Sequence, residues 1–128
     1  TNGNDLISPP LSNDTFGAFA TRNGSNLFSN PGNTNEKLFG PFDTSATTPA
    51  YVEYTVVTDD AVSLIAGKGY RSASVSGTPL AFQGSVLKVD VSTSIINNGE
   101  TDFKSWNLVG NPFSSYVNLP LVLENSTT

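Results

Sequence analysis

The sequence predicts an all-β domain, built as an antiparallel β-sandwich of jelly-roll-like form with an internal pseudo-repeat and at most one short helix. The first observation is a series of short aromatic and β-branched runs separated by turn-forming residues, which is typical of sandwiches. The second is that no segment keeps an i, i+3, i+4 apolar pattern over more than about three turns. The third is a pair of similar octapeptides near the two ends. We expect one module over residues 1–128.

The clearest strand is Tyr51–Val57, "YVEYTVV", in which one Glu interrupts aromatic and β-branched side chains. It ends at the turn-forming pair Asp59-Asp60. Glycines and an Asn-Asn-Gly turn separate the strands predicted after it. These are Val62–Ile65, Gly69–Val75, Pro79–Gln83, Ser85–Ser92 and Trp106–Val109.

Two-residue alternation assigns faces to the strand Ser85–Ser92. Leu87, Val89 and Val91 are predicted to face the core, and the residues between them to face water. This alternation therefore predicts a strand with one face buried in the core and the other exposed to water.

The first part of the chain is predicted to be less regular. Residues 21–49 indicate long loops between short edge strands, anchored at Leu27-Phe28 and Leu38-Phe39. Before them, Asp14 is a candidate N-cap for a short helix over Asp14–Thr21, whose apolar residues are Phe16, Phe19 and Ala20.

The composition excludes several classes of chemistry. The chain has no cysteine, histidine or methionine, so thiol nucleophiles, imidazole bases and the usual zinc sites are absent. Its net charge of −5 argues against nucleic acid as a partner, and no run is long and apolar enough to predict a membrane span. Glu53 could act in a glycosidase only with a second carboxylate, which the sequence does not identify. We therefore expect a protein that is not an enzyme.

Calcium is the one cofactor that the sequence leaves open. Asp59 and Asp60, and likewise Glu100 with Asp102, could supply loop oxygen ligands. Neither pair has the spaced ligands of an EF-hand, and adjacent acids in a turn are commonly solvated. No other cofactor is expected.

The pseudo-repeat aligns Asp5–Ser12, "DLISPPLS", with Asn107–Ser114, "NLVGNPFS". The single tryptophan, Trp106, precedes the second copy, and Asn4 stands at the equivalent place in the first. Trp106 could therefore cap the edge of the core or, if exposed, stack on a sugar ring. The predicted ligand-binding side chains are Trp106, Tyr70, Tyr116 and Tyr54.

Three stretches carry a family resemblance: "AGKGYRS" (Ala66–Ser72), "GTPLAFQGSV" (Gly77–Val86) and "SWNLVGNPFSSYVN" (Ser105–Asn118). They resemble a β module near the C-termini of large secreted and surface proteins of gliding and related bacteria, which the type IX secretion system exports. Ser105 replaces a Gly of that pattern, and Ser114 replaces a frequent Pro. The resemblance implies an extracellular or cell-surface location, and a chain that is a fragment or one unit of a larger multidomain protein.

Two functions follow as expectations. The first is a non-catalytic extracellular structural or adhesive β module; the second is a carbohydrate-binding module attached to a polysaccharide-degrading enzyme. The expected partners are other domains of the same polypeptide, polysaccharide, and neighbouring copies that add a strand at Leu119–Leu123 or at Leu6-Ile7.

Overall fold

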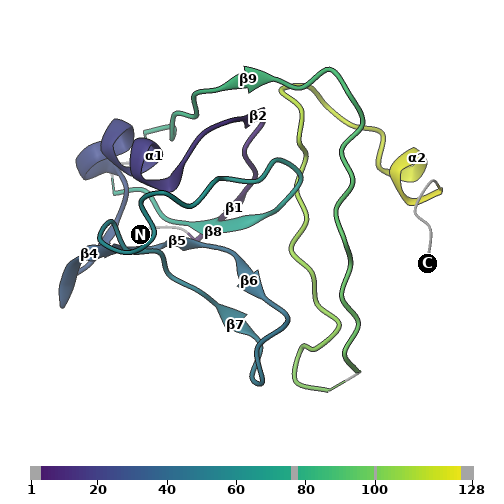
Figure 1. Cartoon of the computed structure of the whole chain (residues 1–128), viewed down its shortest axis with the longest axis horizontal. Helices are drawn as coiled ribbons and strands as arrows, with labels where there is room; N and C mark the ends of the chain where they lie inside the picture. Colours follow the sequence, from purple (N-terminus) through teal and green to yellow (C-terminus); the bar gives the residue numbers. More distant parts are fainter. Residues whose placement is uncertain (1–3, 76–77, 100, 125–128) are drawn as a thin grey trace.

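The computed structural model describes residues 4–75, 78–99 and 101–124 (Figure 1). The chain is mainly β, with short strands in small sheets and short helices beside them. In chain order the elements are β1 (Asp5–Ile7), β2 (Leu11–Ser12), α1 (Phe16–Asn23), the 3₁₀ turn η1 (Gly24–Asn26), β3 (Ser29–Asn30), β4 (Asn33–Lys37), β5 (Phe39–Gly40), β6 (Phe42–Asp43), β7 (Ala50–Tyr51), β8 (Tyr70–Ser72), β9 (Ser85–Val86) and α2 (Leu119–Glu124).

The central sheet has three antiparallel strands in the order β1-β8-β5. Arg71 of β8 lies opposite Leu6 of β1 on one side and Gly40 of β5 on the other. The remaining strands form antiparallel pairs, β2 with β9, β3 with β4 and β6 with β7. The sequence predicts an open strand edge at Leu6-Ile7. These residues belong to β1, which is an edge strand of this sheet.

The predicted strand Tyr51–Val57 is paired along most of its length, although only its start belongs to a named strand, β7. The Tyr54 N–H donates to the Phe39 carbonyl and the Val56 N–H to the Asn35 carbonyl, each at 2.9 Å. A Cβ added at Gly40 would collide with the backbone oxygen of Val52. The absence of a side chain at Gly40 therefore allows the two chains to approach.

The core is built around the ring of Phe39. This ring lies 4.8 Å from Phe19 of α1, 5.6 Å from Phe16 of α1 and 5.1 Å from Tyr70 of β8, between ring centroids. Leu27 and Leu64 complete the buried cluster. Burial of these rings against one another holds α1 on the central sheet, because each removes a large apolar area from water.

The predicted helix is confirmed as α1, but its N-cap is Thr15 and not Asp14. The Thr15 hydroxyl accepts from the Ala18 N–H at 3.3 Å. Asp14 is buried and forms two hydrogen bonds with the Arg22 guanidinium, at 2.9 and 3.0 Å. The carboxylate thus ties the last turn of α1 to the segment that precedes the helix.

Three predicted strands do not belong to a named strand, because one is held by side-chain hydrogen bonds and the other two form only isolated backbone bridges. Residues 79–83 run beside α1, where the Ala81 N–H donates to the Asn23 side chain at 2.8 Å and the Gln83 N–H to Asp14 at 3.1 Å. Residues 62–65 bond to the chain before α1 through the Leu64 N–H. Residues 106–109 contribute one isolated bridge, at Val109.

Only the first two residues of the predicted strand Ser85–Ser92 pair, as β9. The chain then leaves β2, its partner, and Val89 on the predicted core face is 69% exposed. The predicted burial of this face is therefore wrong at Val89, because alternation specifies a face but does not supply a partner sheet.

The predicted strand Leu119–Leu123 is also wrong, because it forms most of helix α2. The Val122 N–H donates to the Asn118 carbonyl at 3.1 Å, and the leucines of the helix are exposed. An apolar run does not by itself distinguish strand from helix. With α2 and η1, the chain exceeds the expectation of at most one short helix. Among the described residues, no helix is both long and apolar enough to cross a membrane.

Candidate functional site

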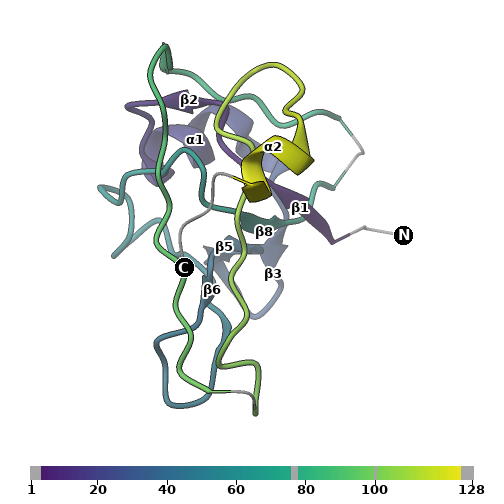
Figure 2. The same cartoon turned by 90° about the vertical axis from the view of Figure 1, so that its right-hand side faces the viewer.

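Residues 87–99 leave the body of the molecule as one extended segment, and residues 101–109 return to it as a second; we call these two segments the arm. The two segments run side by side in Figures 1 and 2. Near the middle, the Asn107 side chain binds both backbone groups of Ile96. Closer to the tip, the Thr44 hydroxyl donates to the Trp106 carbonyl, and at the base Val109 pairs with Lys68. The body therefore positions the backbone of Trp106.

The arm reverses at its tip in a turn from Thr101 to Lys104. The Lys104 N–H donates to the Thr101 carbonyl at 3.2 Å. The two central residues, Asp102 and Phe103, have φ of 57° and 62°. Positive φ at both central positions is the signature of a type I′ turn, which favours Asn-Gly. Asp tolerates this conformation, whereas a bulky residue such as Phe rarely adopts it.

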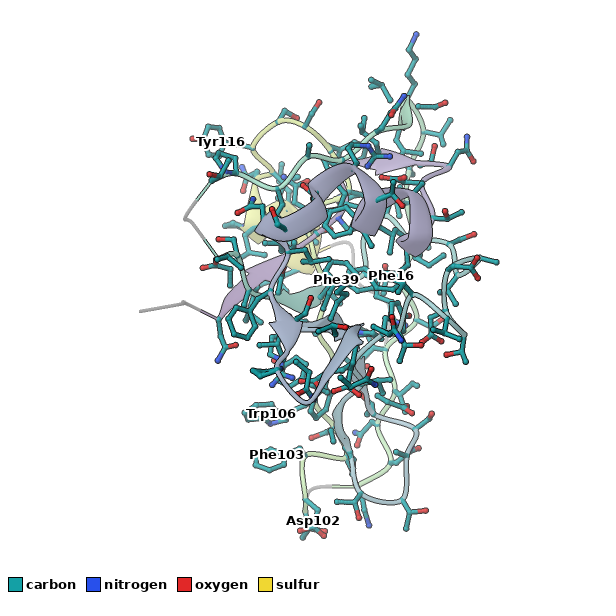
Figure 3. All side chains as sticks on the ribbon, turned by 90° about the vertical axis from the view of Figure 1, so that its left-hand side faces the viewer. Phe16, Phe39, Asp102, Phe103, Trp106 and Tyr116 are labelled. Atoms are coloured by element: carbon teal, nitrogen blue, oxygen red, sulfur yellow. The ribbon has the colours of Figure 1, made fainter. Side chains whose placement is uncertain are left out.

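An aromatic row extends from this tip to the body. Phe103 contacts Trp106 edge to face, with centroids 4.7 Å apart, and Trp106 lies 6.4 Å from Phe42 of β6. Phe42 in turn contacts Tyr51 of β7 at 5.2 Å. Figure 3 shows Phe103 and Trp106 projecting on the same side of the arm. Trp106 is 60% exposed and Phe103 54%, so two large rings face water together.

At the body end of the aromatic row lies a positive charge, that of Arg71, which is paired with a carboxylate. The Arg71 guanidinium lies 4.6 Å from the centroid of the Tyr51 ring, as in a cation–π contact. It also pairs with Glu53 at 2.6 Å. Burial and the neighbouring Glu36 raise the pKa of Glu53, while Arg71 opposes that shift. The cation beside the aromatic row, Arg71, is therefore already paired with the Glu53 carboxylate.

A hollow of about 490 Å³ adjoins the aromatic row at Phe42, between β6 and the base of the arm. Its apolar lining includes Val52 and Leu108. A hydrogen bond from the Ser45 hydroxyl is the largest cause that lowers the pKa of Asp43, and Lys68 contributes in the same direction. The polar residues that line the hollow are Asp43, Thr44, Ser45, Lys68, Thr93, Ser94 and Asn107.

The structure separates the four predicted ligand-binding side chains. Trp106 lies in the aromatic row, and Tyr116 is fully exposed but stands apart from it in Figure 3. Tyr70 is 1% exposed, and its hydroxyl accepts from the Ile65 N–H at 3.0 Å. Tyr54 is half-buried against Phe16, and burial raises its pKa to about 12. Tyr70 is therefore a core ring outside the site, whereas Tyr54 packs against the core cluster and also lines the hollow.

Sequence reasoning missed two members of the aromatic row, Phe103 and Phe42. Phe103 precedes Trp106 by three residues at the end of a turn-forming stretch, and this spacing was a signal that could have been used. Phe42 and Tyr51 lie opposite each other in the β6–β7 pair, which is a tertiary relationship. The rings of the aromatic row are not coplanar, because the planes of neighbouring rings are inclined by 45° to 75°.

The two aspartates predicted as calcium ligands, Asp59 and Asp60, have other contacts in the structure. The Asp59 carboxylate accepts from the Thr55 N–H at 2.8 Å and from the Thr58 hydroxyl at 3.1 Å, so it closes a turn. The Asp60 side chain is exposed, and its backbone oxygen accepts from Gly17. Across residues 4–75, 78–99 and 101–124, no three carboxylate side chains gather as a metal-binding group. Glu100 lies outside the described residues, and calcium binding stays a prediction.

The two copies of the pseudo-repeat contact successive parts of one segment. Ile7 pairs with Tyr70, whereas the Leu108 carbonyl accepts from Gly69 at 2.8 Å. Gly110 of the second copy packs against Ser8 of the first, where a Cβ would collide. The two copies therefore lie next to each other in the structure, although only the first forms named strands.

Comparison with protein-family models, with curated proteins and with solved structures found no match to this chain. Its function is therefore argued from its own residues.

Proposed function

We propose that this chain is a non-catalytic, extracellular structural or adhesive β module of a secreted or cell-surface bacterial protein. The observation that carries the proposal is the aromatic row, whose outer rings, Phe103 and Trp106, are more than half exposed at the end of a projecting arm. Exposed aromatic patches are typical of interaction sites. The resemblance of the "WNLVGNPFSS" stretch to modules exported by the type IX secretion system supports the location.

The energetics of the core favour this reading. The core rings around Phe39 pack without any contribution from Phe103 or Trp106. Neither ring is needed by the core, and a partner that covers both would remove their apolar area from water. The remainder of the chain acts as a scaffold that holds the arm in place through Thr44 and Lys68.

A second candidate is a carbohydrate-binding module attached to a polysaccharide-degrading enzyme. The observation that favours it is the hollow at Phe42, whose hydroxyl and amide lining adjoins the rings. Sugars present apolar C–H faces beside hydroxyl groups, and a row of rings next to hydroxyls matches both. The two candidates differ in whether a neighbouring domain degrades the bound polymer.

The proposal also includes the sandwich architecture and the partners that would add a strand to the sheet. We take a jelly-roll-like sandwich as the arrangement in which the small sheets of the complete protein pack. The exposed edge of β1, with Leu6 62% exposed, is the place where another domain or a second copy would add a strand.

The test measures adhesion directly. Beads coated with the chain are placed on surfaces coated with extracellular polysaccharide, with protein or with nothing, and their retention under flow is counted. We expect retention on the polysaccharide and its loss with Trp106→Ala, while Tyr116→Ala retains it. Beads that adhere to none of the coatings would overturn the adhesive function, and release of reducing sugar would overturn the non-catalytic one.

A further inference from the structure

The tip of the arm places a phenylalanine where the backbone disfavours one. Phe103 is a central residue of the Thr101–Lys104 turn and has φ of 62°. Glycine or asparagine adopts this conformation more readily. Residues held in sparsely populated backbone regions concentrate at functional sites, where the surrounding structure maintains the strain. A Phe at this position therefore requires a reason other than the turn itself.

The strained position brings Phe103 against Trp106. The rings meet edge to face at 4.7 Å with an angle of 67° between their planes, and both remain more than half exposed. The Trp106 N–H donates to the Phe103 carbonyl at 3.0 Å, which couples the two backbones. The turn thus orients two rings for contact with something outside the body.

We propose that Phe103 and Trp106, extended by Phe42 and the adjoining hollow, bind a single soluble chain of a neutral glycan. This inference rests on the proposed function and names the ligand of its contact surface. The C–H faces of a sugar pack on the exposed rings, and its hydroxyls reach the hydroxyls of Ser45, Thr93 and Ser94 in the hollow. A hydroxyl has two acceptor lone pairs besides its donor, so each of these groups can bind a sugar hydroxyl.

The charges near the aromatic row select a neutral glycan. Arg71 at the body end is paired with Glu53, and Lys68 and Asp43, which carry opposite charges, both line the hollow. The chain as a whole carries a net charge of −5. An anionic polymer would be repelled by this field, and the Arg71 cation at the body end is already paired with a carboxylate.

The angles between the rings select a single chain over a crystalline surface. Trp106 is inclined by 67° to Phe103 and by 45° to Phe42. A flat crystalline polymer requires coplanar rings, whereas inclined rings follow a chain that twists. The ligand is therefore a dissolved glycan rather than a crystal face.

The test uses the fluorescence of the whole chain, since Trp106 is its single tryptophan. The probes are a soluble neutral β-glucan, soluble alginate as the anionic polymer, and microcrystalline cellulose in a pelleting assay. We expect a saturable shift with the β-glucan, none with alginate, and no pelleting with cellulose. Phe103→Gly, which suits the turn, is expected to weaken β-glucan binding about tenfold, and Phe103→Asn likewise.

Tyr116→Ala is the control, because it removes an exposed aromatic ring that lies outside the row. Circular dichroism and the unfolding midpoint show whether each variant folds. Unchanged affinity in folded Phe103→Gly and Phe103→Asn would overturn the site and leave the adhesive function intact. Preference for alginate or cellulose, or no shift with β-glucan, would overturn the ligand. Retention of beads on a surface tests the adhesive function separately.

Discussion

The side-chain amide of Asn107 takes the place of a strand neighbour for Ile96: its Nδ2 donates to the Ile96 carbonyl and its Oδ1 accepts from the Ile96 N–H, both at 2.9 Å. The same Nδ2 donates to the Ser105 carbonyl at 3.0 Å. One amide thus joins the two segments of the arm just beside Trp106. This contact explains how segments without a regular ladder keep the aromatic row in place.

Replacing that amide should loosen the arm. Asn107→Ala removes these hydrogen bonds, and we expect a loss of about 1 to 2 kcal/mol in the local free energy of opening. Amide hydrogen exchange at Ile96 measures it, with exchange at Tyr70 in the central sheet unchanged. Asn98→Ala is the control, because Asn98 uses its backbone N–H to bind Lys104. Equal protection of Ile96 in both variants would contradict this role.

The partly buried ion pair at α1, in which the carboxylate is the buried member, should be important for stability. Asp14 is 3% exposed and accepts from Arg22 and from the Gln83 N–H. Arg22→Ala leaves this carboxylate without its cation, and we expect a loss of about 3 to 5 kcal/mol in the free energy of unfolding. Urea unfolding measures it, and Lys88→Ala, at an exposed position, is the control. A loss within the error of that control would show that the pair is dispensable.

Alkaline stability should depend on Tyr54. Burial raises its pKa from 10.0 to about 12, so between these values the unfolded chain loses the phenolic proton before the folded chain does. The contribution of Tyr54 to stability is therefore complete below pH 10.0 and is lost as the pH rises toward 12. Tyr54→Phe should flatten this decline in unfolding midpoint against pH. Tyr116→Phe, at a fully exposed ring, should not change it; an identical decline in all three proteins would contradict the assignment.

Ser72 offers a stabilising substitution. Its hydroxyl is fully buried in β8 and has no hydrogen-bond partner among the described residues. Ser72→Ala removes an unsatisfied polar group, and we expect a gain of about 1 kcal/mol in the free energy of unfolding. Thermal and urea unfolding measure it beside Ser92→Ala, an exposed control expected to have no effect. A destabilised Ser72→Ala protein would show that the hydroxyl is satisfied in solution.

Local sequence patterns determined which segments are extended and which residues turn the chain. The run Tyr51–Val57 pairs with neighbouring strands, and the helix begins where the apolar residues Phe16 and Phe19 recur. These features depend on side chains close together in the sequence, and propensity and periodicity report on them directly. The mainly β character of the chain was predictable for this reason.

Tertiary structure decided which face of each segment is covered. Tyr70 and Trp106 are both aromatic residues beside strand-like sequence, yet Tyr70 is buried by Phe39 and Trp106 is exposed on the arm. Asp14 and Val89 show the same limit. Neighbouring residues in the sequence do not reveal that Asp14 pairs with Arg22, nor that Val89 is left exposed. Burial depends on contacts between segments far apart in the chain. The sequence by itself therefore determined the β-rich character and the supply of aromatic rings, and only the tertiary structure decided which rings form the core and which form the aromatic row.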